Sequence, residues 1–129
     1  MQNLFESLSR PRVPTPLPTQ EVLDIVLAAL DDGKARDVKV LDVRGKTSVT
    51  DYMVVASGTS DRHVRAVADQ VAEKSKERGA PPLGTEGGPA ADWVLVDLGD
   101  VVVHVMKPQA REFYQLEKLW GADSVPSSS

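Results

Sequence analysis

The sequence predicts an α/β sandwich in which helices cover a mixed β-sheet. Apolar residues recur at helical spacing in three segments, and short runs rich in β-branched residues lie between them. The order along the chain is α-β-β-α-(β)-β-β-α, which implies that the strands share one sheet and that the helices pack against it.

The first element is an amphipathic helix that begins near Thr19. Its hydroxyl makes Thr19 the expected N-cap, and Gly33 follows the last apolar residue, so we expect the helix to end there. The apolar stripe consists of Val22, Ile25, Val26, Ala29 and Leu30.

Two strands are expected at 37–43 (DVKVLDV) and 51–57 (DYMVVAS), joined by RGKTSVT as a hairpin or a looser connection. A second helix follows SGTS, with Thr59 or Ser60 as its cap and RGAP at 78–81 as its stop signal. The stripe of this helix consists of Val64, Val67, Ala68 and Val71.

The segment ADWVLVDLGDVVVHVM predicts a hairpin, with strands at 92–98 and 100–106 around a turn at Gly99. A short extended piece at 82–85 is a candidate for one more strand. Pro108 can open a third helix. We expect that helix to end at Gly121 and to place Phe113, Leu116 and Trp120 on one face.

The folded domain is expected to span residues 19–121. Residues 1–18 contain four prolines, which remove backbone donors and oppose helix, and they predict a disordered leader. Residues 122–129 end in SVPSSS and predict a flexible tail. A chain of 129 residues fits one domain that can bury a sufficient core.

Composition restricts the possible functions. The chain has no cysteine, which excludes disulfides and thiolate metal sites, and its N-terminal segment MQNLFESLSRPRVP lacks the apolar core of a signal peptide. No stretch is long enough to span a bilayer, so we expect a cytoplasmic protein. The net charge of −4 argues against direct nucleic-acid binding, which needs a basic surface. It favours a basic protein as the partner.

The alternative to a protein-binding function is an enzyme that acts on nucleotides, with residues 57–60 as phosphate cradle and Asp97 with Asp100 as metal ligands. A purely structural oligomerisation module is a third interpretation. Metal-dependent nucleotidyl transfer needs two carboxylates on one strand face, whereas Asp92 and Asp97 are five residues apart and point to opposite faces. The SGTSDRH segment also lacks the spacing of a P-loop.

The two histidines do not predict a metal site. We expect His63 to be solvated in the first turn of its helix and His104 to be a core-edge residue bonded to a neighbour. No pair of histidines has metal-ligand spacing, so neither a metal nor another cofactor is expected.

Trp93 shares one strand face with Leu95 and Asp97, while Val94 and Val96 take the other. If the valines lie in the core, Trp93 projects outward and can anchor a partner. Alternatively, it lies under the final helix against Phe113 or Trp120.

Four stretches together resemble the ribosomal silencing factor family, RsfS, also called the Iojap or YbeB family. They are, in this order, LDVRGKTSVTDYMVVASGTSDRHV, LGTEG, DWVLVDLGDVVVHVM and REFYQLEKLW. Their separations are similar to those in the family, and the match covers about residues 20–121. The resemblance implies a fold related to nucleotidyltransferases, a homodimer, and no catalytic step. It also implies binding to ribosomal protein L-fourteen on the large subunit, which blocks small-subunit joining and lowers translation when nutrients are scarce.

Carried over residue by residue, the resemblance implies a partner-binding surface on the hairpin with further motif positions nearby. We interpret Trp93 as its apolar anchor, and Asp97 or Asp100 as acceptors for basic side chains of the partner. The chain departs from the family in its leader, its tail and the GGPAA stretch at 87–91. The implied binding residues are Trp93, Leu98, Gly99, Asp100, Glu86, Arg111 and Tyr114.

Overall fold

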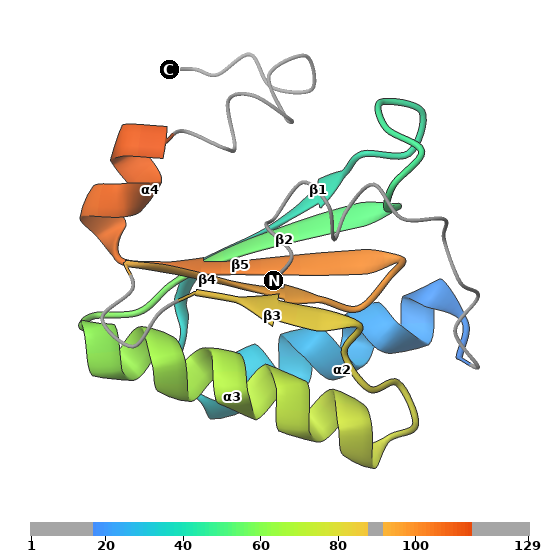
Figure 1. The fold of residues 1–129 in the computed structure, drawn as a ribbon, viewed down its shortest axis with the longest axis horizontal. Coiled ribbons are helices and arrows are strands. Elements are labelled where there is room, and N and C mark those ends of the chain that lie inside the picture. The colour runs from blue at the N-terminus through green and yellow to red at the C-terminus, as the bar shows by residue number, and fades with distance from the viewer. Residues whose placement is uncertain (1–16, 88–91, 115–129) are drawn as a thin grey trace.

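The computed structural model describes residues 17–87 and 92–114. Helices α2 and α3 lie side by side on one face of a five-stranded sheet, and α4 lies at one end of the opposite face (Figure 1). The elements are α2 (Thr19–Asp32), β1 (Arg36–Asp42), β2 (Tyr52–Ser57), α3 (Asp61–Glu77), β3 (Gly84–Glu86), β4 (Trp93–Asp97), β5 (Val101–Met106) and α4 (Pro108–Tyr114).

The sheet is mixed, with the strand order β1-β2-β5-β4-β3. The central strands β2 and β5 are parallel, and every other neighbouring pair is antiparallel. The predicted hairpin is confirmed as β4 and β5, and the candidate strand near 82–85 is confirmed as β3. The mixed α/β class is therefore confirmed, while a relationship to nucleotidyltransferases stays a prediction.

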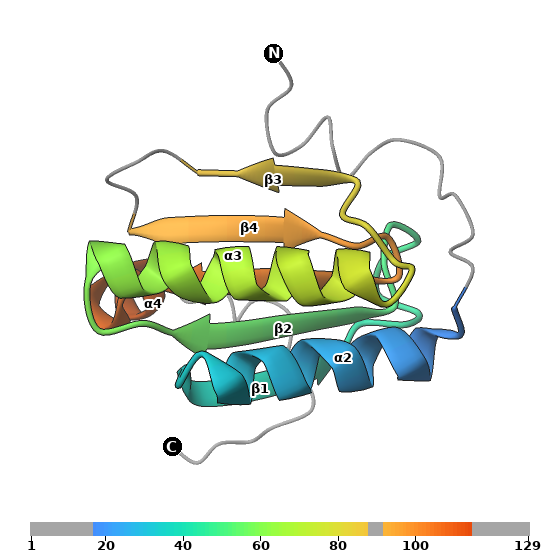
Figure 2. The same cartoon turned by 90° about the horizontal axis from the view of Figure 1, so that it is seen from below.

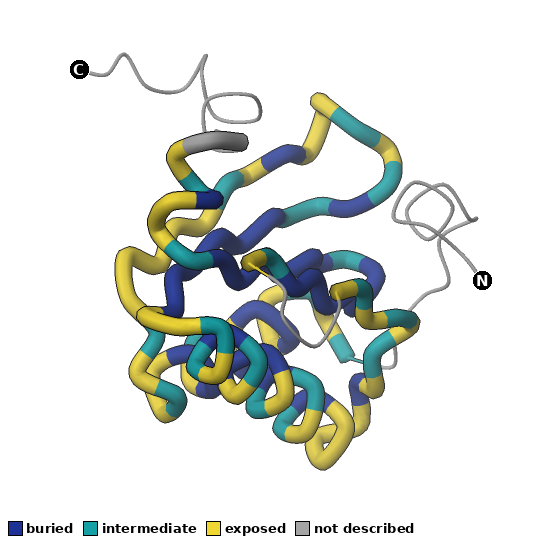
Figure 3. The backbone as a smooth tube through the Cα atoms, turned by 60° about the vertical axis from the view of Figure 1, so that its left-hand side comes forward, coloured by how far each residue is buried: buried dark blue, intermediate teal, exposed yellow. Residues whose placement is uncertain are grey.

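The main core lies between the sheet and the helix pair α2 and α3. Figure 2 shows these two helices lying across one face of the sheet. Alternation along the strands sends every second side chain into this layer, as the predicted period of two requires. Figure 3 shows the buried central strands between more exposed segments. Core residues of the strands include Val54, Ala56, Val94, Val96, Val101, Val103 and Val105.

The predicted helix ends are partly confirmed. Ser60 is the N-cap of α3, and its hydroxyl accepts a hydrogen bond from the His63 N–H at 3.1 Å. The expected cap at Thr19 is wrong, because Pro18 holds the N-cap position and Thr19 is already helical. The Thr19 hydroxyl instead donates to Asp100 Oδ2 at 2.9 Å, a tertiary contact that takes it away from the helix end.

Strand β1 is an exposed edge of the sheet. Its apolar side chains Val38 and Val40 are 38% and 41% exposed. The pairing with β2 is irregular between Arg36 and Lys39, where Asp37 has a positive φ of 50°. An irregularity of this kind twists an edge strand and hinders further pairing.

The third helix begins at Pro108, as predicted. Its expected end at Gly121, the side chain of Phe113, and both Leu116 and Trp120 lie outside what the structure describes. The same is true of the predicted tail and of all but the last two residues of the predicted leader. The domain boundaries therefore stay predictions.

Candidate functional site

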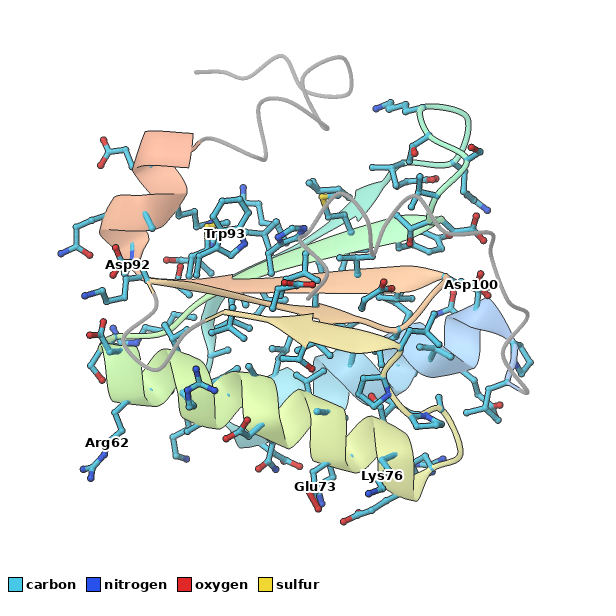
Figure 4. All side chains as sticks on the ribbon, in the orientation of Figure 1. Arg62, Glu73, Lys76, Asp92, Trp93 and Asp100 are labelled. Carbon is cyan, nitrogen blue, oxygen red and sulfur yellow. The ribbon has the colours of Figure 1, made fainter. Side chains whose placement is uncertain are left out.

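The implied binding residues fall into two groups at opposite ends of β4. Trp93 starts this strand beside α4, whereas Asp100 lies beyond its other end, next to the start of α2 (Figure 4). Trp93 is paired with Met106, five strand residues from Val101 beside Asp100, so at about 3.3 Å per residue the two positions are roughly 17 Å apart. The hairpin therefore does not gather these residues into one compact patch.

Trp93 lies half-buried on the sheet face opposite α2 and α3. It packs, as Leu41 does, against a small cluster of Val55, Met106 and Ala110, and the last of these belongs to α4. The half-buried indole lies on the face opposite the core valines, as the first alternative for Trp93 expects. The second alternative, packing against Phe113 or Trp120, involves side chains outside the described part of the chain and stays a prediction.

A hydrogen bond joins the Trp93 indole to His104 on the neighbouring strand β5. Indole Nε1 donates to His104 Nδ1 at 2.9 Å, and the ring centroids are 5.7 Å apart with the planes tilted by 44°. An indole nitrogen can only donate, so Nδ1 is the acceptor and the neutral imidazole carries its proton on Nε2. The expectation that His104 bonds to a neighbour at the core edge is confirmed.

His104 is 2% exposed, and burial lowers its pKa from 6.5 to about 4. The ring is therefore neutral at physiological pH. Its Nε2 atom is buried and has no hydrogen-bond partner among the described residues. An unsatisfied buried donor costs about 1–3 kcal/mol, so the histidine is less favourable here than an apolar residue unless its Nδ1 contact matters.

Two basic side chains fasten α4 to the neighbouring elements. Arg111 Nη1 donates to Ser57 Oγ at the end of β2, at 2.7 Å. Lys107 Nζ lies 2.8 Å from Asp61 Oδ1 and 3.5 Å from Asp92 Oδ1. The hydrogen bond to Asp61 raises the Lys107 pKa. Sequence reasoning missed Lys107, whose place directly before Pro108 was the available signal.

Three residues of the candidate phosphate cradle form hydrogen bonds within the fold. Ser57 accepts from Arg111, Ser60 caps α3, and the Thr59 N–H donates to His63 Nδ1 at 2.9 Å. His63 also bonds through Nε2 to the Gly33 carbonyl at 2.9 Å, so the expectation of a solvated histidine is wrong. This segment ties α3 to the end of α2.

Gly58 is required by the close approach of α3. A Cβ atom there would lie 2.8 Å from both the backbone nitrogen and a side-chain carbon of Val64. The glycine therefore allows α3 to pack closely at the strand-to-helix turn. This explains the glycine of the SGTS motif by structure, without a bound phosphate.

At the other end of β4, the turn residues are mostly enclosed. Leu98 is 1% exposed in the main core, and Asp97 is 4% exposed with its Oδ1 accepting from the Gly99 N–H at 2.9 Å. Gly99 has a φ of +88°, which favours glycine. The interpretation of Asp97 as an acceptor for a partner is wrong, because its carboxylate is buried in the turn, and Leu98 serves the core.

Asp100 is the partly exposed residue of this turn. It accepts from Thr19 through its side chain, and its backbone carbonyl accepts from the N–H groups of Asp51 and Tyr52, each at 3.0 Å. Asp100 thus joins the β4–β5 turn to the start of α2 and to the start of β2. A substitution there changes structure as well as surface charge.

The remaining implied residues are Glu86 and Tyr114. Glu86 on β3 pairs with Leu95, so it shares the sheet face of Trp93 and is half-buried. Tyr114 is the last residue of α4, and its side chain is outside the described part of the chain. The GGPAA departure at 87–91 also lies outside it, apart from Gly87.

Within residues 17–87 and 92–114, three or more histidine, aspartate or glutamate side chains do not gather in a group that could hold a metal ion. None of the helices in these ranges has the length and apolar character needed to cross a membrane.

Comparisons with known proteins agree on one family. The family model described as "Ribosomal silencing factor during starvation" matches residues 16–129. The chain is 46% identical over 99 residues to "Ribosomal silencing factor RsfS" of Haemophilus influenzae, covering 77% of this chain and 97% of that protein. The protein of the same name from Bacillus subtilis is 45% identical over 102 residues, covering 79% and 86%.

A more distant relative and a solved structure extend the comparison. The mouse "Mitochondrial assembly of ribosomal large subunit protein 1" is 41% identical over 101 residues, covering 76% of this chain and 44% of that protein. A crystal structure of a Chromobacterium violaceum protein superposes with a TM-score of 0.80 at 43% identity, covering 88% of this chain and 92% of the other. With a family model matched over residues 16–129 and relatives above 40% identity, the chain belongs to the ribosomal silencing factor family.

Proposed function

We propose that this chain binds the large ribosomal subunit through ribosomal protein L-fourteen and sterically blocks the small subunit, which represses translation under nutrient limitation. The observation that carries the proposal is the family match, since the relatives named as silencing factors are aligned over most of their length. The chain acts in this proposal as a binding protein, without a cofactor and without a catalytic step.

The sheet face around Trp93 is the principal contact surface in this proposal. A half-buried aromatic side chain on a rigid strand loses little conformational freedom on binding, which is typical of an interface anchor. Glu86 lies on the same sheet face, and Arg111 and Tyr114 lie on the adjoining helix. The net charge of −4 suits a basic protein partner better than sequence-specific contact with nucleic acid.

The turn at the far end of β4 supplies a second, smaller contact in the proposal. Gly99 and Asp100 belong to it, with Asp100 as the acceptor for a basic side chain. Leu98 contributes by supporting the turn from inside the core. A partner that touches both Trp93 and Asp100 has to span roughly 17 Å along the hairpin.

Sedimentation tests the proposal directly. The protein is mixed with purified large subunits, with purified small subunits, or with both, and each mixture is separated on a sucrose gradient. We expect the protein to travel with the large subunit and to reduce the amount of joined ribosomes in proportion to its occupancy. Normal joining of large subunits saturated with the protein would rule out the silencing role.

We also propose that the free protein is a homodimer. Val38 and Val40 leave apolar surface on β1 that a second copy can cover. Light scattering at micromolar concentration is expected to report twice the chain mass. A monomer at all concentrations would remove this part of the proposal and leave ribosome binding untouched.

The cytoplasmic location stays a prediction. The bacterial relatives carry no organelle in their names, whereas the mouse relative is named mitochondrial and a maize relative at 31% identity is named chloroplastic. Fractionation of the source cells, with the protein followed by an antibody, measures the location.

A further inference from the structure

We infer that His104 is a positioning residue for the Trp93 anchor, because its Nδ1 holds the indole N–H and thereby fixes the orientation in which the ring meets a partner. The inference rests on the proposed function, in which Trp93 contacts the partner. His104 itself is buried and acts through Trp93.

The register of the sheet makes this contact possible. His104 lies directly opposite Leu95, and Trp93 lies opposite Met106, so the tryptophan and histidine are diagonal neighbours on one sheet face. Diagonal neighbours on antiparallel strands are within reach of aromatic side chains. The 2.9 Å bond between the rings therefore needs no change in the backbone.

The residue type at position 104 is explained by this bond. The strand reads VVVHVM, and its other members are apolar residues that suit a buried strand. An apolar side chain at 104 would avoid the buried, unpartnered Nε2–H, yet it could not accept from the indole. The imidazole supplies an acceptor at the place where Trp93 has its donor.

The bond also fixes the tautomer of the imidazole. Trp93 donates only while Nδ1 is unprotonated, and burial keeps the ring neutral by lowering its pKa to about 4. The indole is then held through its nitrogen edge, so the ring cannot exchange between orientations without breaking a hydrogen bond. A partner consequently meets a preorganised aromatic surface, which improves affinity without adding a contact.

The test replaces the acceptor and measures binding to large subunits. His104→Leu introduces an apolar side chain that has no acceptor, whereas His104→Asn keeps an acceptor near the position of Nδ1. We expect His104→Leu to weaken binding about tenfold, the effect of losing roughly one hydrogen bond, while thermal unfolding stays at or above the wild-type temperature. We expect His104→Asn to retain most of the affinity.

A double-substitution cycle separates positioning from a general effect. Trp93→Phe keeps an aromatic ring but has no N–H, so it should weaken binding to a similar degree. In the Trp93→Phe background, His104→Leu should cause little further loss, because the bond it removes is already absent. Independent, additive losses would overturn the inference.

An NMR measurement detects the Trp93–His104 hydrogen bond in the absence of ribosomes. The chain has two tryptophans, so the indole N–H signal of Trp93 is identified by its absence in Trp93→Phe. We expect this signal to lose protection from hydrogen exchange in His104→Leu and to keep it in His104→Asn. Unchanged protection in His104→Leu would overturn the inference.

The outcomes distinguish this inference from the proposed function. If the wild-type protein does not bind large subunits, the proposed function fails, while the NMR measurement still tests the positioning contact. If binding is normal in a folded His104→Leu variant, the inference fails and the proposed function stands. Should His104→Leu not fold, Trp93→Phe decides, because wild-type affinity in that variant would overturn the inference.

Discussion

Thr19 and Asp100 are 81 positions apart, yet the Thr19 hydroxyl donates to the Asp100 carboxylate at 2.9 Å. The contact joins the first turn of α2 to the β4–β5 turn, where the Asp100 carbonyl also accepts from Asp51 and Tyr52. A residue implied in partner binding is thereby part of the framework, and tests of its function have to separate the two roles.

Thr19→Val and Asp100→Lys together make that separation. Both remove the hydrogen bond, so each should lower the free energy of unfolding by about 0.5–1.5 kcal/mol in urea denaturation. Only Asp100→Lys places a positive charge before a basic partner, so it alone should slow association with large subunits and change its salt dependence. Equal loss of binding in both variants would show that Asp100 acts through the fold.

Trp93→Ala should weaken binding to the large subunit by about 2–4 kcal/mol, which is roughly thirtyfold to a thousandfold in affinity. The indole is only half-buried, so its removal should cost less stability than truncation of a core aromatic residue. Sedimentation measures the affinity, and thermal unfolding of the same sample is the control. Full binding by a folded Trp93→Ala variant would contradict its role as anchor.

Gly58→Ala should be severely destabilising, because the added Cβ would meet the Val64 backbone at 2.8 Å. We expect a loss of about 2–4 kcal/mol or failure to fold, since α3 has to move away from β2. Gly45→Ala is the matched control. Its φ of +84° disfavours alanine but nothing lies within 4 Å, so about 1 kcal/mol is expected there. Denaturation midpoints of the two variants compare the effects, and equal losses would contradict the packing argument.

Stability should fall as the pH is lowered from about 6.5 to 4, because the unfolded chain protonates His104 in this range while the buried ring stays neutral. A histidine with a lowered pKa favours the folded state at higher pH, and the gap from 6.5 to about 4 corresponds to roughly 3 kcal/mol. His104→Asn should lack this contribution, as urea denaturation at pH 7 and pH 4.5 would measure.

Asp42 contributes to stability in a different pH range and serves as a comparison for His104. Its hydrogen bond with Arg44 lowers the Asp42 pKa from 3.8 to about 2, so its contribution is present above 3.8 and is lost as the pH falls toward 2. The variant His104→Asn should leave that lower window unchanged. An equal pH dependence of wild type and His104→Asn between 6.5 and 4 would contradict the assignment to His104.

Local patterns predicted most of the fold because they record which side of a strand or helix is buried. The alternation of Val94 and Val96 against Trp93 is confirmed, and so is the cap at Ser60. Leu98 is two residues after Val96 and lies on the same face as the two valines, so the same alternation predicts that it is buried. The interpretation of Leu98 as a binding residue overlooked this.

Contacts between distant segments could not be predicted in the same way. Nothing in the spacing of Thr19 indicates that the β4–β5 turn lies beside it, because that contact depends on how α2 packs across the sheet. The pairing of Arg111 with Ser57 likewise needs the parallel arrangement of β2 and β5, which brings the ends of these two strands together.

The irregular β1 edge limits how large an assembly can grow. Regular pairing with β2 covers Lys39 to Asp42, four residues, and the opposite edge of the sheet is the three-residue strand β3. A head-to-tail stack would need both edges to form long ladders, and neither edge is long enough to support one. Association through the edges of the described sheet therefore does not continue into a fibre.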